Sequence, residues 1–215
     1  VLLGLIAEAL TGRTLAEEGL REEPKPSGYS IKAPVFPFDR FPGFNPVLGP
    51  EMRSTGEAYG SDPEFGLAFV KAMMSAGQTL PAHGTVFLSV NDRDKDEIVP
   101  IARTFHELGF RLVGTQGTAA RLRREGFPCD AVFKVNEGRP HVADRIFNSE
   151  IDLVVNTPLG GTSYYDEHAM RRAAIACRVP ILSTLSAARA AAEGIGRLRT
   201  TVLTVRALQD LPHPA

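Results

Sequence analysis

A chain of 215 residues with 43% hydrophobic residues can bury a substantial core, as one large domain or two modest ones. Its formal net charge is −1, and residues 1–83 carry 7 basic and 10 acidic side chains while the remainder carries 17 and 15. This even balance excludes the strongly basic surface of a nucleic-acid-binding protein, so we expect a globular protein with no nucleic-acid partner.

The first residues are apolar but lack the features of a targeting or membrane segment. The run Val1–Ile6 is short, has no basic leader and is soon followed by Glu8, so we expect neither a signal peptide nor a membrane span. Because the chain does not start with Met, we expect it to begin inside a longer protein. Helical apolar spacing predicts a helix over residues 2–10 that ends at Gly12, and its apolar face predicts self-association into an oligomer or local disorder.

The metal-binding and redox residue types show no ligand pattern. Cys129 and Cys177 have no partner at CxxC or metal-type spacing, and the five histidines show no HxxxH spacing. We therefore expect reduced thiols, a cytoplasmic location and no metal in this chain.

Residues 29–75 combine weak strand signals with one clear helix. Tyr29–Phe38 contains two prolines and can form only an edge strand, and Glu51–Glu57 predicts a polar strand. Ser61–Glu64 predicts the capped start of a helix. The predicted buried face of that helix comprises Phe65, Ala68, Phe69, Ala72 and Met73.

Beyond a linker at 76–84, apolar strands alternate with helices. Thr85–Val90 predicts a strand, and a helical stripe from Ile98 to Leu108 stops at Gly109. This helix either starts near Glu97 or kinks at Pro100. Further strands are expected up to Gly114 and at Ala131, Leu153, Pro180 and Thr201–Val205, with helices from Thr118, at Val142–Phe147, from about Asp166 to Cys177 and at Ala187. The order predicts an α/β fold, a Rossmann-like parallel sheet with helices on both faces.

The stretch Gly109–Leu122 carries the clearest sign of a binding site. It reads as a strand, a hydroxyl-bearing turn and a helix start, in which Gly117 lets the backbone approach an anion closely. Carboxyl ends of parallel strands meet at one edge of a sheet, and hydroxyl, amide and basic side chains follow several predicted strands there. They are Lys95, Thr115, Thr118, Lys134, Asn156 and Thr157. Together they suit a phosphomonoester that carries a polar base or sugar, although each alone also fits turn geometry or a solvated surface charge.

Motifs along nearly the whole chain add a family resemblance. They are Leu48-Gly-Pro-Glu-Met-Arg-Ser-Thr-Gly-Glu57, Leu88-Ser-Val with Asp94-Lys95, Thr115-Gln-Gly-Thr118, Glu137-Gly-Arg-Pro-His141 and Val155-Asn-Thr157. The chain thereby resembles the C-terminal part of the large subunit of carbamoyl phosphate synthetase. The resemblance implies that residues 1–80 are the α+β tail of the second ATP-grasp half, 83–206 a methylglyoxal-synthase-like allosteric domain, and 207–215 a tail.

The resemblance also implies a function and partners. In that family the domain binds nucleotide effectors such as UMP, which inhibits, and IMP. The whole enzyme, a ligase, makes carbamoyl phosphate from bicarbonate, glutamine-derived ammonia and ATP for pyrimidine and arginine biosynthesis. This implies ATP and Mg²⁺ or Mn²⁺ as cofactors of the full-length enzyme, with a glutamine amidotransferase small subunit and the missing N-terminal part of the same subunit as partners. The chain itself would hold no cofactor and no catalytic residue.

Residue by residue, the family's effector contacts fall on the six candidate positions. One family threonine, two places after the asparagine, is Pro158 here, so we expect nucleotide preference or affinity to differ. The family's ornithine site uses an acid and a tyrosine at the places of Ala33 and Ile181, so we expect ornithine activation to be weak or absent.

The main alternative is an enzyme of the same fold. Methylglyoxal synthase, a lyase acting on dihydroxyacetone phosphate, carries its base in a Gly-Gly-Asp loop, but the matching place here is Arg139, which cannot serve as a base. Gly160-Gly161 looks similar but follows a later strand. Asp166 and His168 could be proposed as substitutes for the base, but an Asp at a helix start is more often a cap or a first-turn acid than a base. A third interpretation, the nucleotide-cyclising domain of a purine-pathway enzyme, does not account for Met52–Glu57.

Overall fold

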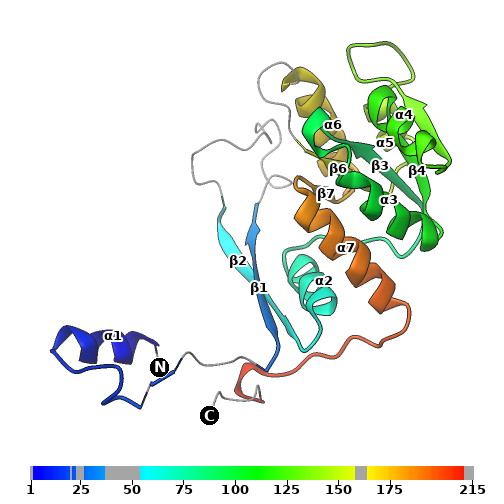
Figure 1. The fold of residues 1–215 in the computed structure, drawn as a ribbon. Helices are drawn as coiled ribbons and strands as arrows, with labels where there is room; N and C mark the ends of the chain where they lie inside the picture. The colour runs from blue at the N-terminus through cyan, green and yellow to red at the C-terminus, as the bar shows by residue number, and fades with distance from the viewer. Residues whose placement is uncertain (1, 20, 23–26, 37–53, 158–163, 211–215) are drawn as a thin grey trace. The chain divides into compact units, whose positions relative to one another are not determined.

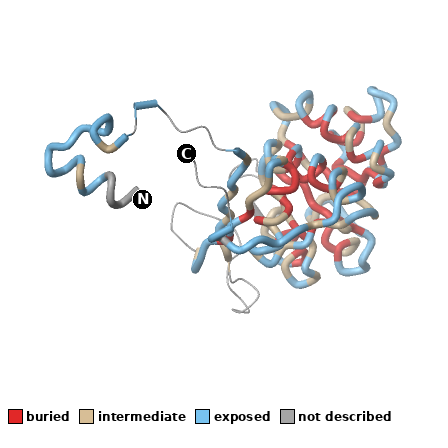
Figure 2. The backbone as a smooth tube through the Cα atoms, turned by 90° about the horizontal axis from the view of Figure 1, so that it is seen from below, coloured by how far each residue is buried: buried red, intermediate tan, exposed pale blue. Residues whose placement is uncertain are grey.

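The structure, a computed structural model, describes residues 2–19, 21–22, 27–36, 54–157 and 164–210. Contacts divide the chain into two compact units, one of residues 1–28 and 204–215 and the other of residues 29–203. Figure 2 shows that the buried residues concentrate in the second unit. The core that positions the candidate site is therefore the core of residues 29–203.

The first unit contains the predicted N-terminal helix, α1 (Leu2–Leu10). Gly12 ends it with a φ of 93°, a left-handed conformation that favours glycine. Arg13 lies 3.4 Å from Glu8 and 2.8 Å from Glu18, so ion pairs fix the turn after the helix. Leu10 is 83% exposed, and the self-association of this face stays a prediction.

The second unit begins with a two-stranded antiparallel sheet. Strand β1 (Tyr29–Val35) pairs with β2 (Gly56–Asp62), with Ala33 opposite Ala58. The edge-strand prediction is confirmed for β1, but the strand expected at Glu51–Glu57 was wrong in position, since residues 54–55 lie outside β2 and residues 51–53 lie outside the described part of the chain. A Cβ atom at Gly60 would overlap the backbone of α2 (Phe65–Ser75), so a close helix contact fixes β2.

Helix α2 differs from its prediction at the start and in its buried face. It begins at Phe65 after an N-cap Glu64 that makes no side-chain capping bond, because Ser61 and Asp62 belong to β2. Its buried residues are Gly66, Leu67, Ala68, Val70 and Ala72. Phe65 is instead 39% exposed and meets the ring of Tyr29 edge-to-face at 5.5 Å, so this aromatic side chain covers the small sheet rather than the core.

The predicted parallel α/β sheet is confirmed, with five strands in the order β5-β4-β3-β6-β7. These strands are β3 (Thr85–Ser89), β4 (Arg111–Thr115), β5 (Cys129–Val132), β6 (Leu153–Asn156) and β7 (Ile181–Leu182). All neighbouring pairs run parallel. The chain builds one half of the sheet outward from β3 and then returns to add β6 on its other side, which is the Rossmann-like order.

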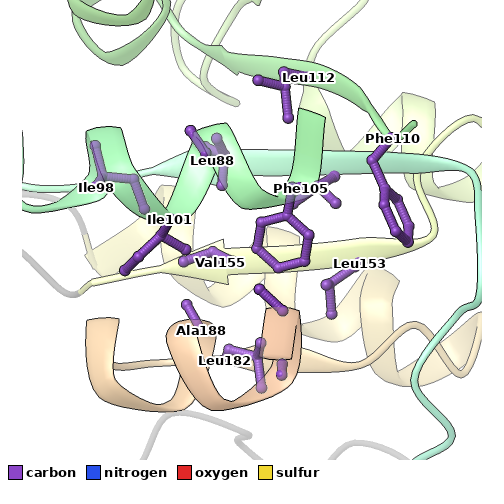
Figure 3. Packing of buried hydrophobic residues seen from close by; sticks show 14 of the residues in the cluster. Leu88, Ile98, Ile101, Phe105, Phe110, Leu112, Leu153, Val155, Leu182 and Ala188 are labelled. Carbon is purple, nitrogen blue, oxygen red and sulfur yellow. The ribbon is translucent and has the colours of Figure 1, made fainter. Parts of the chain in front are cut away.

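Helices cover both faces of this sheet, as Figure 1 shows. Helices α3 (Ile98–Glu107), α4 (Gln116–Arg124) and α7 (Leu185–Leu198) share one apolar cluster with the sheet. Helices α5 (Val142–Phe147) and α6 (Tyr164–Ala176) share the cluster on the other face. In Figure 3, Phe105 of α3 packs beside Phe110, Leu153 and Leu182, and its ring meets Phe110 edge-to-face at 5.7 Å.

The start of α3 resolves the question of Pro100. The helix begins at Ile98 with Glu97 as N-cap, so Pro100 lies in the first turn, where its missing N–H costs no helical hydrogen bond. Gly109 ends this segment with a φ of 77°, as predicted from the stripe of apolar residues.

The predicted last strand at Thr201–Val205 was wrong. The described residues there form no strand, and Val202 and Val205 are 86% and 98% exposed. Alternating apolar residues form a strand only beside a hydrogen-bonding neighbour.

The predicted domain boundary at residues 80–83 falls between α2 and β3, which lie in one compact unit. The assignment of residues 1–80 to an ATP-grasp tail stays a prediction.

Candidate functional site

The candidate residues gather at the carboxyl ends of β3, β4 and β6. Ser89 pairs with Asn156, while Leu88 pairs with Gly114, so the ends of three adjacent strands are aligned. The chain proceeds from β3 toward β4 but from β6 toward β7, so the connections after these two neighbouring strands lead in opposite directions, and ligands of open α/β sheets bind at such switch points. Asn156 and Thr157 are 8% and 6% exposed, so this polar group is built into the fold.

Thr115 and Thr118 form a buried pair where β4 meets α4. Thr115 Oγ1 donates to Thr118 Oγ1 at 3.2 Å, and the Val90 N–H donates to the same oxygen at 3.4 Å. The predicted helix start at Thr118 was two residues late, because α4 begins at Gln116 with Thr115 as its N-cap. Thr118 is fully buried, so its hydroxyl fixes the end of β3 against the first turn of α4.

Lys95 lies over the first turn of α4. A Cβ atom at Gly117 would be 2.8 Å from Lys95 Nζ, so the absence of a side chain makes room for the ammonium group. Among the described residues no side-chain hydrogen bond caps α4, and the first N–H groups of a helix attract anions. The ammonium group of Lys95 therefore lies beside the N-terminal turn of α4.

Asn91 connects the end of β3 to Thr157, and the sequence interpretation missed it. Its backbone N–H and its side-chain Nδ2 donate to Thr157 Oγ1 at 3.1 and 3.2 Å. Its Oδ1 accepts from the N–H groups of Arg93 and Asp94 at 2.9 and 3.2 Å and caps the short 3-10 helix Asp92–Asp94. An Asn followed three residues later by Asp directly after a buried strand was the available signal.

The Lys95 ammonium carries an acidic partner, also absent from the sequence interpretation. Asp92 Oδ1 lies 2.5 Å from Lys95 Nζ. The hydrogen bond and the charge of Lys95 lower the pKa of the Asp92 carboxyl below its usual value, and the charge of Lys134 acts in the same direction. Because both lysines lower the pKa of the same carboxyl, Lys95 and Lys134 both lie close enough to interact electrostatically with Asp92.

Lys134 lies in a turn beyond the strand whose end it was predicted to occupy. Strand β5 ends at Val132, and Phe133 bridges to His141. The Lys134 N–H donates to Glu137 Oε2 at 2.9 Å, and the Glu137 N–H donates back to the Lys134 carbonyl at 3.1 Å. The turn fixes the Lys134 backbone at the sheet edge.

Asn156 contributes a side-chain amide at the end of β6. Only 8% of the residue is exposed, but its amide atoms are not among the buried side-chain atoms that lack a partner in the described part of the chain. An amide at a strand end offers both donor and acceptor atoms and is suited to pairing with a ligand.

Arg139 occupies the position at which a lyase of this fold would carry its base. The Arg139 side chain is 79% exposed and lies 3.5 Å from Asp144 Oδ1. His141 and Asp144 form a reciprocal capping box at the start of α5, with Asp144 N–H donating to His141 Nδ1 at 3.2 Å. These side chains therefore stabilise a helix start.

Several further predictions lie outside the described residues. Pro158 and Gly160-Gly161 are among them, and Asp166 is placed only by the backbone of α6. In the described part of the chain, no three His, Cys, Asp or Glu side chains come together as a metal site requires. Every described helix is too short or too polar to cross a membrane.

A hollow of about 310 Å³ lies at the opposite, amino edge of the sheet. Arg111 and Asp130 line it and pair with each other, which neutralises its charge. His106 and Phe110 contribute much of the remaining lining. The hollow contains none of the six candidate residues, so it is separate from the site described above.

Comparison with known proteins finds a domain family, several relatives and a solved structure. Residues 97–183 match the MGS-like domain. The chain is 49% identical over 209 residues to the carbamoyl phosphate synthase large chain of Gemmatimonas aurantiaca, covering 97% of this chain and 19% of that protein. It is 45% identical over 210 residues to the large chain, C-terminal section, of Methanopyrus kandleri, covering 95% and 39%. A solved methylglyoxal synthase from Elizabethkingia anophelis is 20% identical, with a TM-score of 0.42 over 51% of this chain and 76% of its own.

These lengths set the scope of the similarity. The chain spans about one fifth of the full-length large chains that it matches, and the match extends over nearly all of its own residues. The chain is therefore a homologue of a C-terminal section of the carbamoyl phosphate synthase large chain, and at residues 97–183 it contains an MGS-like domain.

Proposed function

We propose that the chain is the regulatory C-terminal region of a carbamoyl phosphate synthase large subunit and binds a nucleoside monophosphate effector, UMP or IMP. The observation that carries the proposal is the position of Lys95 Nζ over Gly117 at the start of α4. A phosphate there would meet an ammonium group and helix N–H groups together, and both are favourable partners for an anion.

The surrounding residues suit the two ends of such a ligand. Lys134 adds positive charge on the phosphate side, since its field reaches the carboxylate that touches Lys95. Asn156 offers an amide with both donor and acceptor atoms, which can pair with the polar edge of a base. Hydrogen bonds fix the side chains of Thr115 and Thr157, so their positions at the site would need no rearrangement when a ligand binds.

Regulation follows from thermodynamic linkage. An effector that binds one state of the enzyme more tightly shifts the equilibrium by no more than its difference in affinity, typically about 1–3 kcal/mol. The reaction itself would belong to the longer protein, which would use ATP and Mg²⁺ or Mn²⁺ and receive ammonia from a glutamine amidotransferase small subunit in the cytoplasm, for pyrimidine and arginine biosynthesis. The 215-residue chain alone would be catalytically silent.

A lyase of the methylglyoxal synthase type is the alternative function. It requires a base beside a carbonyl-activating group. The exposed Arg139 beside Asp144, and the use of Asp144 in the helix cap, favour regulation instead.

Calorimetric titration of the 215-residue chain with UMP and with IMP tests the proposal. We expect one nucleotide to bind and Lys134→Ala to weaken binding about tenfold or more, the effect of losing one charge-assisted contact of about 1.4 kcal/mol. Lys32→Ala is the matched control, because Lys32 lies on β1 and pairs with Glu57 at 2.7 Å.

Two results would overturn the assignment. Equal losses in both variants would show that the lysine effect is general rather than local to the site. Consumption of dihydroxyacetone phosphate by the wild-type chain would instead establish the lyase.

A further inference from the structure

One charged contact of the site is left unexplained by nucleotide binding. Lys95 Nζ, the group best placed to hold a phosphate, lies 2.5 Å from Asp92 Oδ1. A carboxylate and a phosphate are both anions that an ammonium group binds through oxygen. The two would therefore require the same face of one ammonium group.

We propose that Asp92 competes with the ligand's phosphate for Lys95 and thereby sets the affinity and the charge selectivity of the site. The inference rests on the proposed function and adds to it a named residue with an opposing role. Asp92 weakens binding of every anion, and it weakens binding of a dianion more than binding of a monoanion, so it reduces the advantage that the lysine and the helix N-terminus give to the more highly charged ligand.

The local structure keeps the Asp92 carboxylate within reach of Lys95. Asn91 caps the short helix Asp92–Asp94 through its Oδ1, and Asp94 Oδ2 accepts from Asn91 Nδ2 at 2.6 Å. This fixed turn brings the side chains of Asp92 and Lys95, three residues apart, together on one side. Lys134 adds a second attractive charge, which helps to retain the carboxylate.

The same contact is easily displaced. The Asp92 side chain is 91% exposed, whereas that of Lys95 is 27% exposed. Exposed ion pairs contribute little net stability because water competes for both charges. A phosphate that also meets the first N–H groups of α4 gains contacts that the Asp92 carboxylate lacks, so it can take over the ammonium group while Asp92 turns to water.

Electrostatics predicts how the effect depends on the ligand. The repulsion between Asp92 and a bound anion is proportional to the charge of that anion. Removing the carboxylate should tighten binding of a monoanion roughly threefold at physiological salt, and the dianion should gain about the square of that factor, roughly tenfold. A neutral ligand should gain nothing.

The test compares Asp92→Asn with Asp96→Asn in the 215-residue chain. Asp96→Asn is a matched control because it also removes one carboxylate, from the residue next to Lys95. The Asp96 side chain is 87% exposed and pairs with Arg121 at 3.0 Å rather than with Lys95. Calorimetry at pH 7.5 would use uridine, the monoanionic methyl ester of UMP, and UMP with both proteins and the wild type. We expect Asp92→Asn to bind UMP roughly tenfold and the methyl ester roughly threefold more tightly than the wild type, with uridine and Asp96→Asn unchanged.

The outcomes separate this inference from the proposed function. If the wild type binds UMP but Asp92→Asn gains no more than Asp96→Asn, the competition is refuted and the effector site stands. An equal gain for all three ligands would indicate a change in pocket shape and would also refute it. Failure of every variant to bind UMP overturns both.

Discussion

Replacing Gly117 by alanine should make the folded protein more stable but weaken the binding of a phosphate at the site. Gly117 is the second residue of α4 and its backbone conformation is one that alanine accepts. Alanine in place of a helical glycine stabilises a protein by about 0.5–1 kcal/mol. In a domain of this size that gain raises Tm by about 1–4 °C.

The added methyl group acts differently on the ligand site. It would lie 2.8 Å from Lys95 Nζ, closer than real Cβ atoms approach a neighbour. Because the ammonium group ends a flexible chain, it moves aside at little cost to folding. The methyl group then occupies the space through which a phosphate reaches the helix N–H groups, and we expect the affinity for UMP to fall about tenfold, or about 1.4 kcal/mol.

Thermal unfolding and calorimetry on two variants test this reasoning. Gly196→Ala in α7 is the matched control, since its Cβ would meet Leu108 at an ordinary 3.6 Å and lies in a different helix. Both variants should raise Tm, and only Gly117→Ala should lose affinity for UMP. Undiminished UMP binding by Gly117→Ala would refute the close backbone approach, and a lower Tm would refute the assumed tolerance of the helix.

Three further predictions concern the packing of α2 against α7 and the two cysteines. Gly194→Ala should lower the free energy of unfolding by about 1–3 kcal/mol through overpacking. The new Cβ atom would lie 2.5 Å from Val70 Cγ2 and 2.6 Å from the Gly66 carbonyl oxygen. An unchanged Tm would contradict the packing of α2 against α7. Burial raises the pKa of Cys129 to about 11, so iodoacetamide at pH 8 should alkylate Cys177 first, as mass spectrometry of the digested protein can show. The pKa of the Cys129 thiol in the folded protein is above its ordinary value of 9.0, so the buried protonated thiol contributes to stability at lower pH. That contribution is lost as the pH rises from about 9 to about 11. In urea unfolding, the free energy of unfolding of Cys129→Ala should therefore fall less over this pH range than that of the wild type.

The sequence predicted the parallel sheet well because its signals are local and repeated. The stripe from Ile98 to Phe105 and the glycine at 109 define α3 by themselves, and the apolar strands around Phe87 and Val154 need no distant information. Strand β2 was misplaced because its position depends on Gly60 packing against α2, a contact that strand propensity does not contain. The expected strand after α7 failed for the related reason that a strand needs a neighbour to pair with.

The candidate site shows the same division between local and distant information. Strand-end positions were enough to bring Thr115 and Asn156 to one edge of the sheet. The sequence did not show that Thr118 would be fully buried as an acceptor for Val90, since its burial depends on how α4 approaches β3. Asp92 was missed because an acid near a lysine is common on protein surfaces, and only the geometry places it on Lys95.

The location of the phosphate is the central claim, and a crystal structure of the 215-residue chain with bound UMP tests it most directly. We expect phosphate oxygens within about 3 Å of Lys95 Nζ, above Gly117 at the start of α4, with the Asp92 carboxylate displaced from the ammonium group. A phosphate bound instead in the hollow beside Arg111, at the opposite edge of the sheet, would contradict the account.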